Sequence, residues 1–426
     1  MELVVKKSNL KGNVPIPGSK SHTIRAIVIA SLAEGESFIR NPLISSDTLS
    51  AVNCYRALGA EIDASDPKVW KVTGTGGRID VPDQIIDVGN SGTTLRLAIA
   101  SAALSCGRAS IQLTGDSQIQ SRPVGPLLDS VTDLGAKATA LRGDQKPPVA
   151  VSGKLTGGKT SIKCTTNQYL SSLLLAVPLA EDDTVIDVTL LNEPDYVQIT
   201  LDWLDRQSIR YEHDRMQSFN IPGRQKYKAF DMTIPADFSS ATFFFCAGAI
   251  LNSDITLTGL DFSDSQPDKA VADYLRRMGA NIEVNTKGVH INSAKLNGIE
   301  IDMNRTPDAL PAMAVAAAFA QGTTRLVNVP QARNKETDRI KCMAEELKKA
   351  SVNVEELPDG LIIHPSRPKA GYFDGRDDHR IVMALSLLGM AVNGTTTIDT
   401  AEAVDVTFPE YVDLMKSIGA KMEIVD

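Results

Sequence analysis

The feature that most constrains the fold of this chain is an internal repeat. Six segments share one pattern: a polar cluster, a long apolar run rich in Ala and Leu, a polar turn, and a stretch rich in β-branched residues. They begin 67–75 residues apart, at Ser19, Asn90, Thr165, Asp237, Asn304 and Asp377. Repeats of this size bury a core only by packing against their neighbours. The pattern therefore predicts an α/β fold assembled from six comparable units.

A second helix and strand follow the first within each unit. Four copies end this helix with a Gly-Ala pair before a β-rich run, in RALGAEID, DLGAKATA, RRMGANIEV and KSIGAKMEIV. Weaker copies read DRQSIRYE and KKASVNVEE. Glycine directly after a helix is typical of a C-cap. We therefore expect two helices in every unit, with short strands between them.

Three units of this length make a domain of ordinary size, which favours two domains of three units each. The polar segment 214–230 lies between the third and fourth units, and we place the crossing near residues 228–234. The N-terminal strand precedes the first unit, so the residues alone allow it to pair with either domain.

Composition excludes several classes of protein. The net charge of -8 gives no general attraction for nucleic acid or for an anionic membrane. No apolar run reaches the length of about 18 residues that suggests a membrane span, and the N-terminus lacks the apolar core of a signal peptide. The cysteines show no CxxC spacing, which argues against a disulfide framework or a zinc site and favours a reducing cytoplasm; they are Cys54, Cys106, Cys164, Cys246 and Cys342.

The polar clusters that open the repeats have two interpretations. Ser, Thr, Asn and Asp at a helix N-terminus are ordinary caps. However, a helix N-terminus also binds anions, and its dipole disfavours cations by about 0.3–1 kcal/mol each. Three of the clusters nevertheless carry cations at or near the helix start, which suggests a functional site; the four cations are Lys20, Arg25, Arg96 and Arg380.

Two further segments are polar and basic. GDSQIQSRP places Arg122 directly before a proline, and RNKETDRI brings Lys335, Glu336 and Arg339 close together. A loop salt bridge would explain the first, and a solvated helix start with charge pairs would explain the second. Likewise, Asp308 and Asp378 could simply cap helices, and His379 could be a neutral surface or core histidine.

Taken together, these groups predict binding of strongly anionic substrates, with carboxylates left for proton transfer. The sequence has no HxxxH or DxDxDG pattern for a metal, no GxGxxG after a strand and no GxxxxGK[ST]. We therefore expect neither a metal nor a nucleotide cofactor.

The segments GSKSHTIR, NSGTTLR, GDSQIQSRP, RTPDALP, KETDR and DDHR, in this order, resemble the enolpyruvyl transferases over essentially the whole chain. The match is closest to the members that act on 3-phosphoshikimate. The resemblance implies a two-domain α/β (α+β) fold, an inside-out α/β barrel with six βαβαββ repeats, three per domain. It implies domains at 1–18 plus 232–426 and at 19–231, with the active site in the cleft between them.

The activity implied is transfer of the enolpyruvyl (1-carboxyvinyl) group of phosphoenolpyruvate to the 5-hydroxyl of 3-phosphoshikimate. Phosphate is released through a tetrahedral addition-elimination intermediate. This is the sixth step of the shikimate pathway to chorismate and the aromatic amino acids. The resemblance further implies a cytoplasmic monomer that needs no cofactor and binds neither nucleic acid nor membrane.

Individual roles follow from the same resemblance. Asp308 matches the base for the 5-hydroxyl, Glu336 the acid for the methylene carbon, and Lys20 a residue that touches both substrates. The 3-phosphoshikimate contacts correspond to Lys20, Ser21, Arg25, Thr166, Asn167, Gln168, Asp308, Gln331 and Lys335. The phosphoenolpyruvate contacts correspond to Lys20, Gly92, Arg122, Gln168, Arg339, His379 and Arg380.

The chain departs from the family pattern at several of these positions. Thr166-Asn167 replaces the usual Ser-Ser pair, Gln331 replaces an asparagine, and Val406 stands where many members have a lysine. Thr23-Ile24 replaces a common Ser-Asn pair, and the segment NEPDYVQIT aligns only loosely, with Tyr196 as its one match. Gly92 leaves room beside phosphoenolpyruvate, which makes inhibition by glyphosate a further expectation.

Two alternatives compete with this assignment. A UDP-N-acetylglucosamine enolpyruvyl transferase would share the fold, but its reactive cysteine is expected in the loop before Arg122, and GDSQIQ contains none. A non-catalytic binder with a decayed site is the second alternative. Retention of Lys20, Asp308, Lys335 and Glu336 argues against it.

Overall fold

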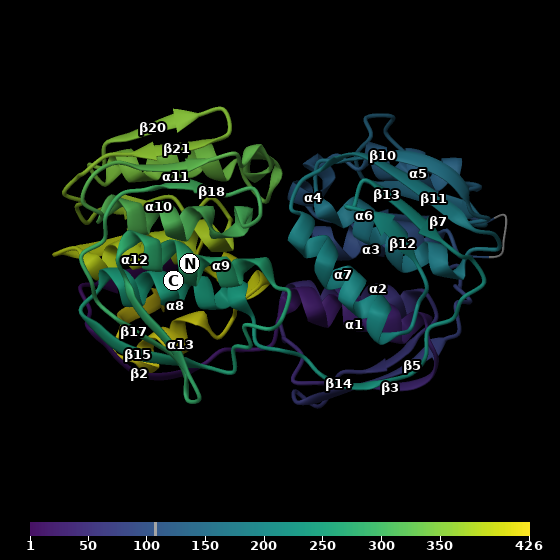
Figure 1. The fold of residues 1–426 in the computed structure, drawn as a ribbon, viewed down its shortest axis with the longest axis horizontal. Coiled ribbons are helices and arrows are strands. Elements are labelled where there is room, and N and C mark those ends of the chain that lie inside the picture. The colour runs from purple at the N-terminus through teal and green to yellow at the C-terminus, as the bar shows by residue number, and fades with distance from the viewer. Residues whose placement is uncertain (106–108) are drawn as a thin grey trace. The chain divides into compact units, whose positions relative to one another are not determined.

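The computed structural model describes residues 1–105 and 109–426, and Cys106 lies outside them. The chain forms two compact units. Unit 1 contains Met1–Pro17 and Pro235–Asp426, and unit 2 contains Gly18–Ile234. Each unit has its own continuous hydrophobic core. Figure 1 shows helices and strands intermixed within each of them.

Three helices form the interior of unit 2: α1 (Lys20–Leu32), α3 (Gly92–Ala102) and α6 (Asn167–Ala176). They are buried at nearly every position, as expected for helices that are apolar all round. Helix α3 packs against both α1 and α6. Three half-exposed helices surround them: α2 (Ser46–Ala57), α5 (Gly125–Asp133) and α7 (Pro194–Arg206).

Unit 1 repeats this arrangement. Its inner helices are α8 (Phe238–Ile250), α10 (Leu310–Ala318) and α12 (His379–Ala391), which all pack on one another. The outer helices are α9 (Ala270–Met278), α11 (Arg339–Lys349) and α13 (Tyr411–Ser417).

The described residues form six four-stranded sheets, and every sheet has one parallel pair followed by two antiparallel pairs. In unit 2 the first sheet has the strand order β14 (Asp231–Thr233), β3 (Glu34–Arg40), β5 (Val69–Thr75), β4 (Glu61–Asp63). The second has the order β6 (Ile86–Asp87), β7 (Ile111–Thr114), β9 (Val149–Gly153), β8 (Ala136–Ala140). The third has the order β10 (Gly158–Cys164), β11 (Thr184–Leu191), β13 (Ser218–Ile221), β12 (Glu212–Asp214). In unit 1 the first sheet has the strand order β2 (Leu10–Pro15), β15 (Ser253–Thr258), β17 (Gly288–Asn292), β16 (Asn281–Asn285). The second has the order β18 (Glu300–Asp302), β19 (Thr324–Val327), β21 (Gly360–Ile363), β20 (Val354–Leu357). The last has the order β22 (Tyr372–Phe373), β23 (Thr395–Ile398), β1 (Glu2–Lys6), β24 (Lys421–Val425).

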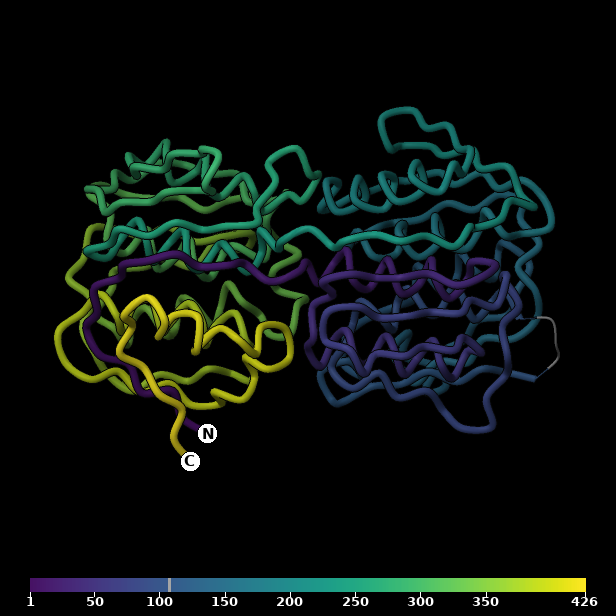
Figure 2. Tube along the Cα trace, turned by 90° about the horizontal axis from the view of Figure 1, so that it is seen from below, coloured from purple at the N-terminus to yellow at the C-terminus, as the bar shows by residue number. Residues whose placement is uncertain are grey.

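The chain ends complete the repeats. Strand β1 lies between β23 and β24 in the last sheet, and β2 pairs in parallel with β15. The N-terminal strand, which the residues alone left open, therefore belongs to unit 1. In Figure 2 the N- and C-terminal segments run together, as the pairing of β1 with β24 requires. Strand β14 pairs in parallel with β3 and so completes the first sheet of unit 2.

The end of the second helix in each repeat has a left-handed residue, which confirms the predicted C-caps. The four predicted glycines, Gly59, Gly135, Gly279 and Gly419, have φ between +104° and +105°. In the two weaker copies Ser208 and Ser351 take this position, with φ of +57° and +64°. The backbone repeat is thus more regular than the sequence repeat, because serine can adopt a conformation that glycine favours.

Candidate active site

The predicted polar clusters lie at the N-termini of the inner helices. Helices α1, α3 and α6 begin at Lys20, Gly92 and Asn167, and α12 begins at His379 with Asp378 as its N-cap. Asp308 differs, because it lies in a 3₁₀ turn (Pro307–Ala309) that precedes α10. These positions confirm the expected helix starts and bring chemically active side chains to one end of the inner helices within each unit.

Arg339, the first residue of α11, is the centre of a buried charged cluster in unit 1. Only 1% of its side chain is exposed. Its Nε donates to Asp378 Oδ2 at 2.8 Å, its Nη1 donates to Asp308 Oδ1 at 2.9 Å, and its Nη2 is hydrogen-bonded to Glu336. A planar guanidinium suits such multiple carboxylate contacts. Burial lowers the pKa of Arg339, but the three carboxylates outweigh it and raise the pKa above its usual range.

Two further cationic side chains lie close to the carboxylate of Asp308. Lys335 Nζ lies 3.6 Å from Asp308 Oδ1, and Arg380 Nη2 lies 3.2 Å from Asp308 Oδ2. Burial raises the pKa of Asp308, but the charges of Arg380, Lys335 and Arg339 dominate and hold it well below its usual range. Asp308 is therefore fully ionised at neutral pH, with its charge stabilised by all three cations.

The N-terminus of α12 supplies the rest of this cluster. Asp378 caps the helix by accepting from Arg380 N at 2.9 Å, and Arg380 Nη2 donates to Ser239 Oγ at 2.7 Å. His379 is 2% exposed, and burial lowers the pKa of its imidazole to about 3. His379 is therefore neutral at physiological pH. Gln331 lies in the 3₁₀ turn Pro330–Asn334 before α11, and its amide donates to Asn304 O at 2.9 Å.

Arg25 in unit 2 is also buried, but its partners are neutral. Its guanidinium donates to Thr200 Oγ1 at 2.8 Å, to Ser171 Oγ at 3.4 Å, and to the backbone oxygens of Tyr196 and Ser21 at 3.1 and 3.0 Å. Burial lowers its pKa to about 10, so Arg25 remains charged at neutral pH. A buried cation held by neutral dipoles alone is suited to an incoming anion.

A second group in unit 2 surrounds the start of α3. A Cβ on Gly92 would lie 2.8 Å from Arg122 Nη1 and 3.2 Å from Arg96 Nη1, so glycine allows both guanidinium groups to approach the backbone. Arg96 Nη1 donates to Gln168 Oε1 at 2.5 Å, and Gln168 Nε2 donates to Thr93 Oγ1 at 2.9 Å. The structure thus brings Gly92, Arg122 and Gln168 together, as an anion-binding group requires.

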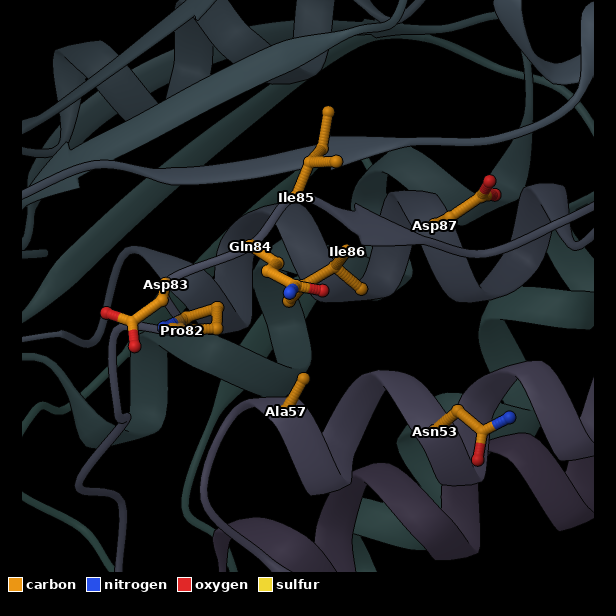
Figure 3. Close-up of a pocket in the computed structure, with 8 residues that line it drawn as sticks. All are labelled: Asn53, Ala57, Pro82, Asp83, Gln84, Ile85, Ile86 and Asp87. Atoms are coloured by element: carbon orange, nitrogen blue, oxygen red, sulfur yellow. The ribbon is translucent and has the colours of Figure 1, made fainter.

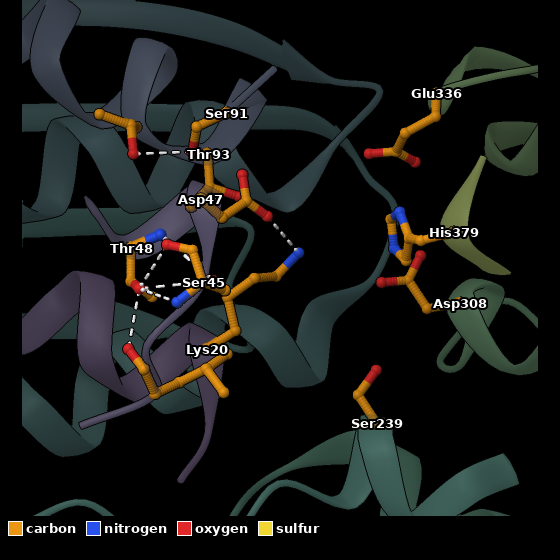
Figure 4. A network of polar contacts seen from close by, with 12 residues as sticks. Lys20, Ser45, Asp47, Thr48, Ser91, Thr93, Ser239, Asp308, Glu336 and His379 are labelled. Carbon is orange, nitrogen blue, oxygen red and sulfur yellow. Dashed lines mark hydrogen bonds and ion pairs between the residues drawn. The ribbon is translucent and has the colours of Figure 1, made fainter. Parts of the chain in front are cut away.

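Lys20 is held by a residue that the sequence analysis did not identify. Its Nζ lies 2.9 Å from Asp47 Oδ2, and Asp47 is buried in the first turn of α2 (Figure 4). Ser45 and Thr48 form a capping box that fixes the start of this helix. The only available signal was the Ser-Ser-Asp-Thr run, which indicates a helix start but not its partner.

Glu193 is the second residue that the sequence analysis did not identify. It lies at the N-cap of α7, is fully buried, and accepts from Asn167 N at 3.3 Å and from Thr166 Oγ1 at 3.4 Å. Asn167 Nδ2 also donates to its carboxylate. The predicted contact residues Thr166 and Asn167 therefore already have an anionic partner.

Other features of the described residues carry no comparable chemistry. An open pocket of about 450 Å³ lies beside α2 and β6 in Figure 3, and it includes none of the predicted site residues. Across residues 1–105 and 109–426, no three His, Cys, Asp or Glu side chains are grouped so that they could hold a metal ion. Within the same residues, every helix is too short or too polar to cross a bilayer.

Comparison with known proteins assigns the chain to a family. The model of EPSP synthase (3-phosphoshikimate 1-carboxyvinyltransferase) matches residues 4–415. A 3-phosphoshikimate 1-carboxyvinyltransferase from Ruminiclostridium cellulolyticum is 52% identical over 425 residues, covering 100% of both chains. Another from Acetivibrio thermocellus is 53% identical over 420 residues, covering 99% of each. The structure of an EPSP synthase from Acinetobacter baumannii superposes with a TM-score of 0.84 at 26% identity, covering 100% of both chains. The family match, the full-length relatives and the shared fold agree, and this chain belongs to the EPSP synthase (3-phosphoshikimate 1-carboxyvinyltransferase) family.

Proposed function

We propose that this chain transfers the carboxyvinyl group of phosphoenolpyruvate to the 5-hydroxyl of 3-phosphoshikimate and releases phosphate. Family membership supports the reaction. The observation that carries it within this chain is Asp308, a carboxylate with 19% of its side chain exposed that contacts Lys335, Arg339 and Arg380. These groups supply a base and cationic sites for anionic substrates in one place.

The two substrates are bound by cations with different surroundings. Arg339 and Arg380 bind phosphoenolpyruvate from unit 1, with His379 beside them, and the unit 2 contacts to this substrate are Lys20, Gly92, Arg122 and Gln168. The acceptor is bound through Lys20, Ser21, Arg25, Thr166, Asn167, Gln168, Gln331 and Lys335. Guanidinium forks match carboxylate and phosphate oxygens, which accounts for the high proportion of arginine.

Asp308 acts as the general base. A catalytic base works best when its pKa lies near the working pH, and three cations now hold the pKa of Asp308 far below that range. Anionic substrates that bind Arg339, Arg380 and Lys335 would partly neutralise these cations. The cations would then stabilise the ionised form of Asp308 less. Its pKa would therefore rise when the acceptor is in place.

The reaction proceeds by addition and then elimination. Asp308 removes the proton from the acceptor 5-hydroxyl, the oxygen bonds to C2 of phosphoenolpyruvate, and Glu336 delivers a proton to the methylene carbon. In the tetrahedral intermediate that results, the C–O bond to phosphate then breaks and the methyl group loses a proton. The hydrogen bond to Arg339 positions Glu336 for both proton transfers. We also propose that the enzyme works as a cytoplasmic monomer.

Phosphate release measured with both substrates tests this function. We expect turnover only when phosphoenolpyruvate and 3-phosphoshikimate are present together, and no release with either one alone. UDP-N-acetylglucosamine offered as the acceptor should give no reaction. Folded protein that releases no phosphate with both substrates would contradict the proposal, and turnover with the nucleotide sugar would favour the alternative transferase.

A further inference from the structure

The buried carboxylate of Glu193 lies at the N-terminus of α6. Glu193 is 0% exposed and has left-handed backbone with φ of +58°, directly before Pro194 at the start of α7. The first N–H groups of a helix lack partners within the helix and carry partial positive charge. The Glu193 carboxylate is an anion built into this position by the chain itself.

The donors that hold Glu193 are the groups assigned above to the acceptor. Asn167 N and Thr166 Oγ1 donate to Glu193 Oε2 at 3.3 and 3.4 Å, and Asn167 Nδ2 donates to the same oxygen. A phosphate at these donors would have to share or displace them. Two anions at hydrogen-bonding distance also repel each other, and more strongly in a buried site than in water.

The surroundings connect this carboxylate to the rest of the acceptor site. Asn167 and Ser171 are four residues apart in α6 and so lie on one face of it. Ser171 accepts from Arg25, and Arg25 also donates to the backbone oxygen of Tyr196, three residues after Glu193. The segment that carries Glu193 therefore contacts both Arg25 and the start of α6.

We propose that Glu193 is a specificity-determining residue that competes with the acceptor's phosphate for the donors of Thr166 and Asn167. The inference rests on the proposed function, because that function assigns those donors to 3-phosphoshikimate. Binding of the phosphate displaces the carboxylate by rotation of the Glu193 side chain, which lowers the apparent affinity for the acceptor. The loosely matching segment NEPDYVQIT is then a functional departure at this site.

Calorimetric titration of Glu193→Gln with 3-phosphoshikimate tests the competition. Glutamine keeps the size of the side chain and removes its charge, so we expect the dissociation constant to fall about tenfold. Titration with shikimate, which lacks the phosphate, should give the same affinity in both proteins. Glu212→Gln, an exposed substitution on β12, is the matched control and should change either constant less than twofold.

An unchanged or weaker affinity for 3-phosphoshikimate in Glu193→Gln would overturn the inference, as would an equal gain for shikimate. If Glu193→Gln does not fold, Glu193→Ser removes the charge with a shorter side chain and is judged by the same constants. Phosphate release separates the two claims. If the wild-type protein releases phosphate but Glu193→Gln binds 3-phosphoshikimate with an unchanged dissociation constant, the inference alone is overturned. If Glu193→Gln binds 3-phosphoshikimate more tightly but the wild-type protein releases no phosphate, only the proposed function is overturned.

Discussion

The two units bury guanidinium groups in opposite ways. In unit 1, Arg339 meets the carboxylates of Asp308, Glu336 and Asp378 within one cluster. In unit 2, Arg25 is equally buried, and its hydrogen bonds go to hydroxyl and backbone oxygens. The first arrangement is neutralised by the protein, and the second keeps a positive charge available for a ligand.

This difference predicts that removing each arginine affects the free energy of unfolding and ligand binding to different extents. Removing one partner of a buried ion pair leaves the other charge without compensation and typically costs 3–5 kcal/mol. A buried charge that has only neutral partners is already costly, so its removal is far less destabilising. We therefore infer that the unit 1 cluster contributes to stability as well as to substrate binding and proton transfer, whereas Arg25 contributes mainly to ligand binding.

The largest expected effect comes from the proton-transfer groups of the unit 1 cluster. Glu336→Gln should lower kcat by about 10²–10⁴-fold, because glutamine cannot exchange the proton. Arg339 keeps its contacts to Asp308 and Asp378, so we expect the fold to persist. Steady-state phosphate release measures the effect, with the exposed Glu423→Gln as control. Wild-type kcat in Glu336→Gln would remove Glu336 from the proton-transfer role.

The next effect tests the neutralised cluster directly. Arg339→Met removes the common partner of three carboxylates and should lower the free energy of unfolding by about 3–5 kcal/mol. Denaturant unfolding followed by circular dichroism measures this change. A loss below about 1 kcal/mol, the value typical of surface ion pairs, would mean that the cluster does not stabilise unit 1.

Lys20 differs from Arg25 in unit 2, because its partner is a carboxylate: Lys20 Nζ lies 2.9 Å from Asp47 Oδ2. Asp47→Asn removes the charge that positions Lys20, and we expect KM for both substrates to rise about tenfold, or about 1.4 kcal/mol. Asp47→Glu should restore part of this loss, since it restores the charge. Equal KM values in wild type and Asp47→Asn would show that the pair has no positioning role.

The smallest effect concerns the pH dependence of stability in unit 1. Burial lowers the pKa of His379 from 6.5 to about 3. Between these values the unfolded chain binds a proton that the folded chain does not, so stability falls as the pH falls below about 6.5. At pH 5.5 the loss is about 1.4 kcal/mol.

Comparison of His379→Gln with wild type at pH 7.5 and pH 5.5 isolates this contribution. The variant lacks the titrating imidazole, so its free energy of unfolding should fall less than that of wild type over this interval. His213→Gln, at an exposed position on β12, should follow wild type. Identical pH dependence in His379→Gln and wild type would contradict the depressed pKa.

Much of the fold could be predicted from the sequence, because repeated helix starts and Gly-Ala helix ends recur at nearly constant spacing. Residue patterns alone could not place β1, since its partners β23 and β24 come from the far end of the chain, and only the family resemblance grouped residues 1–18 with 232–426. The clusters at Lys20, Gly92 and Asp308 were identifiable from their motifs. Glu193 was not identifiable, because only the fold brings its carboxylate to Asn167 from a loosely matching segment 26 residues away.

Arg25→Met provides the most direct test of the contrast between the units. We expect the dissociation constant for 3-phosphoshikimate to rise at least 100-fold, or about 2.7 kcal/mol. The free energy of unfolding should change by only about 1 kcal/mol, far less than in Arg339→Met. Unfolding losses of equal size in the two variants, or wild-type affinity for 3-phosphoshikimate in Arg25→Met, would contradict the account.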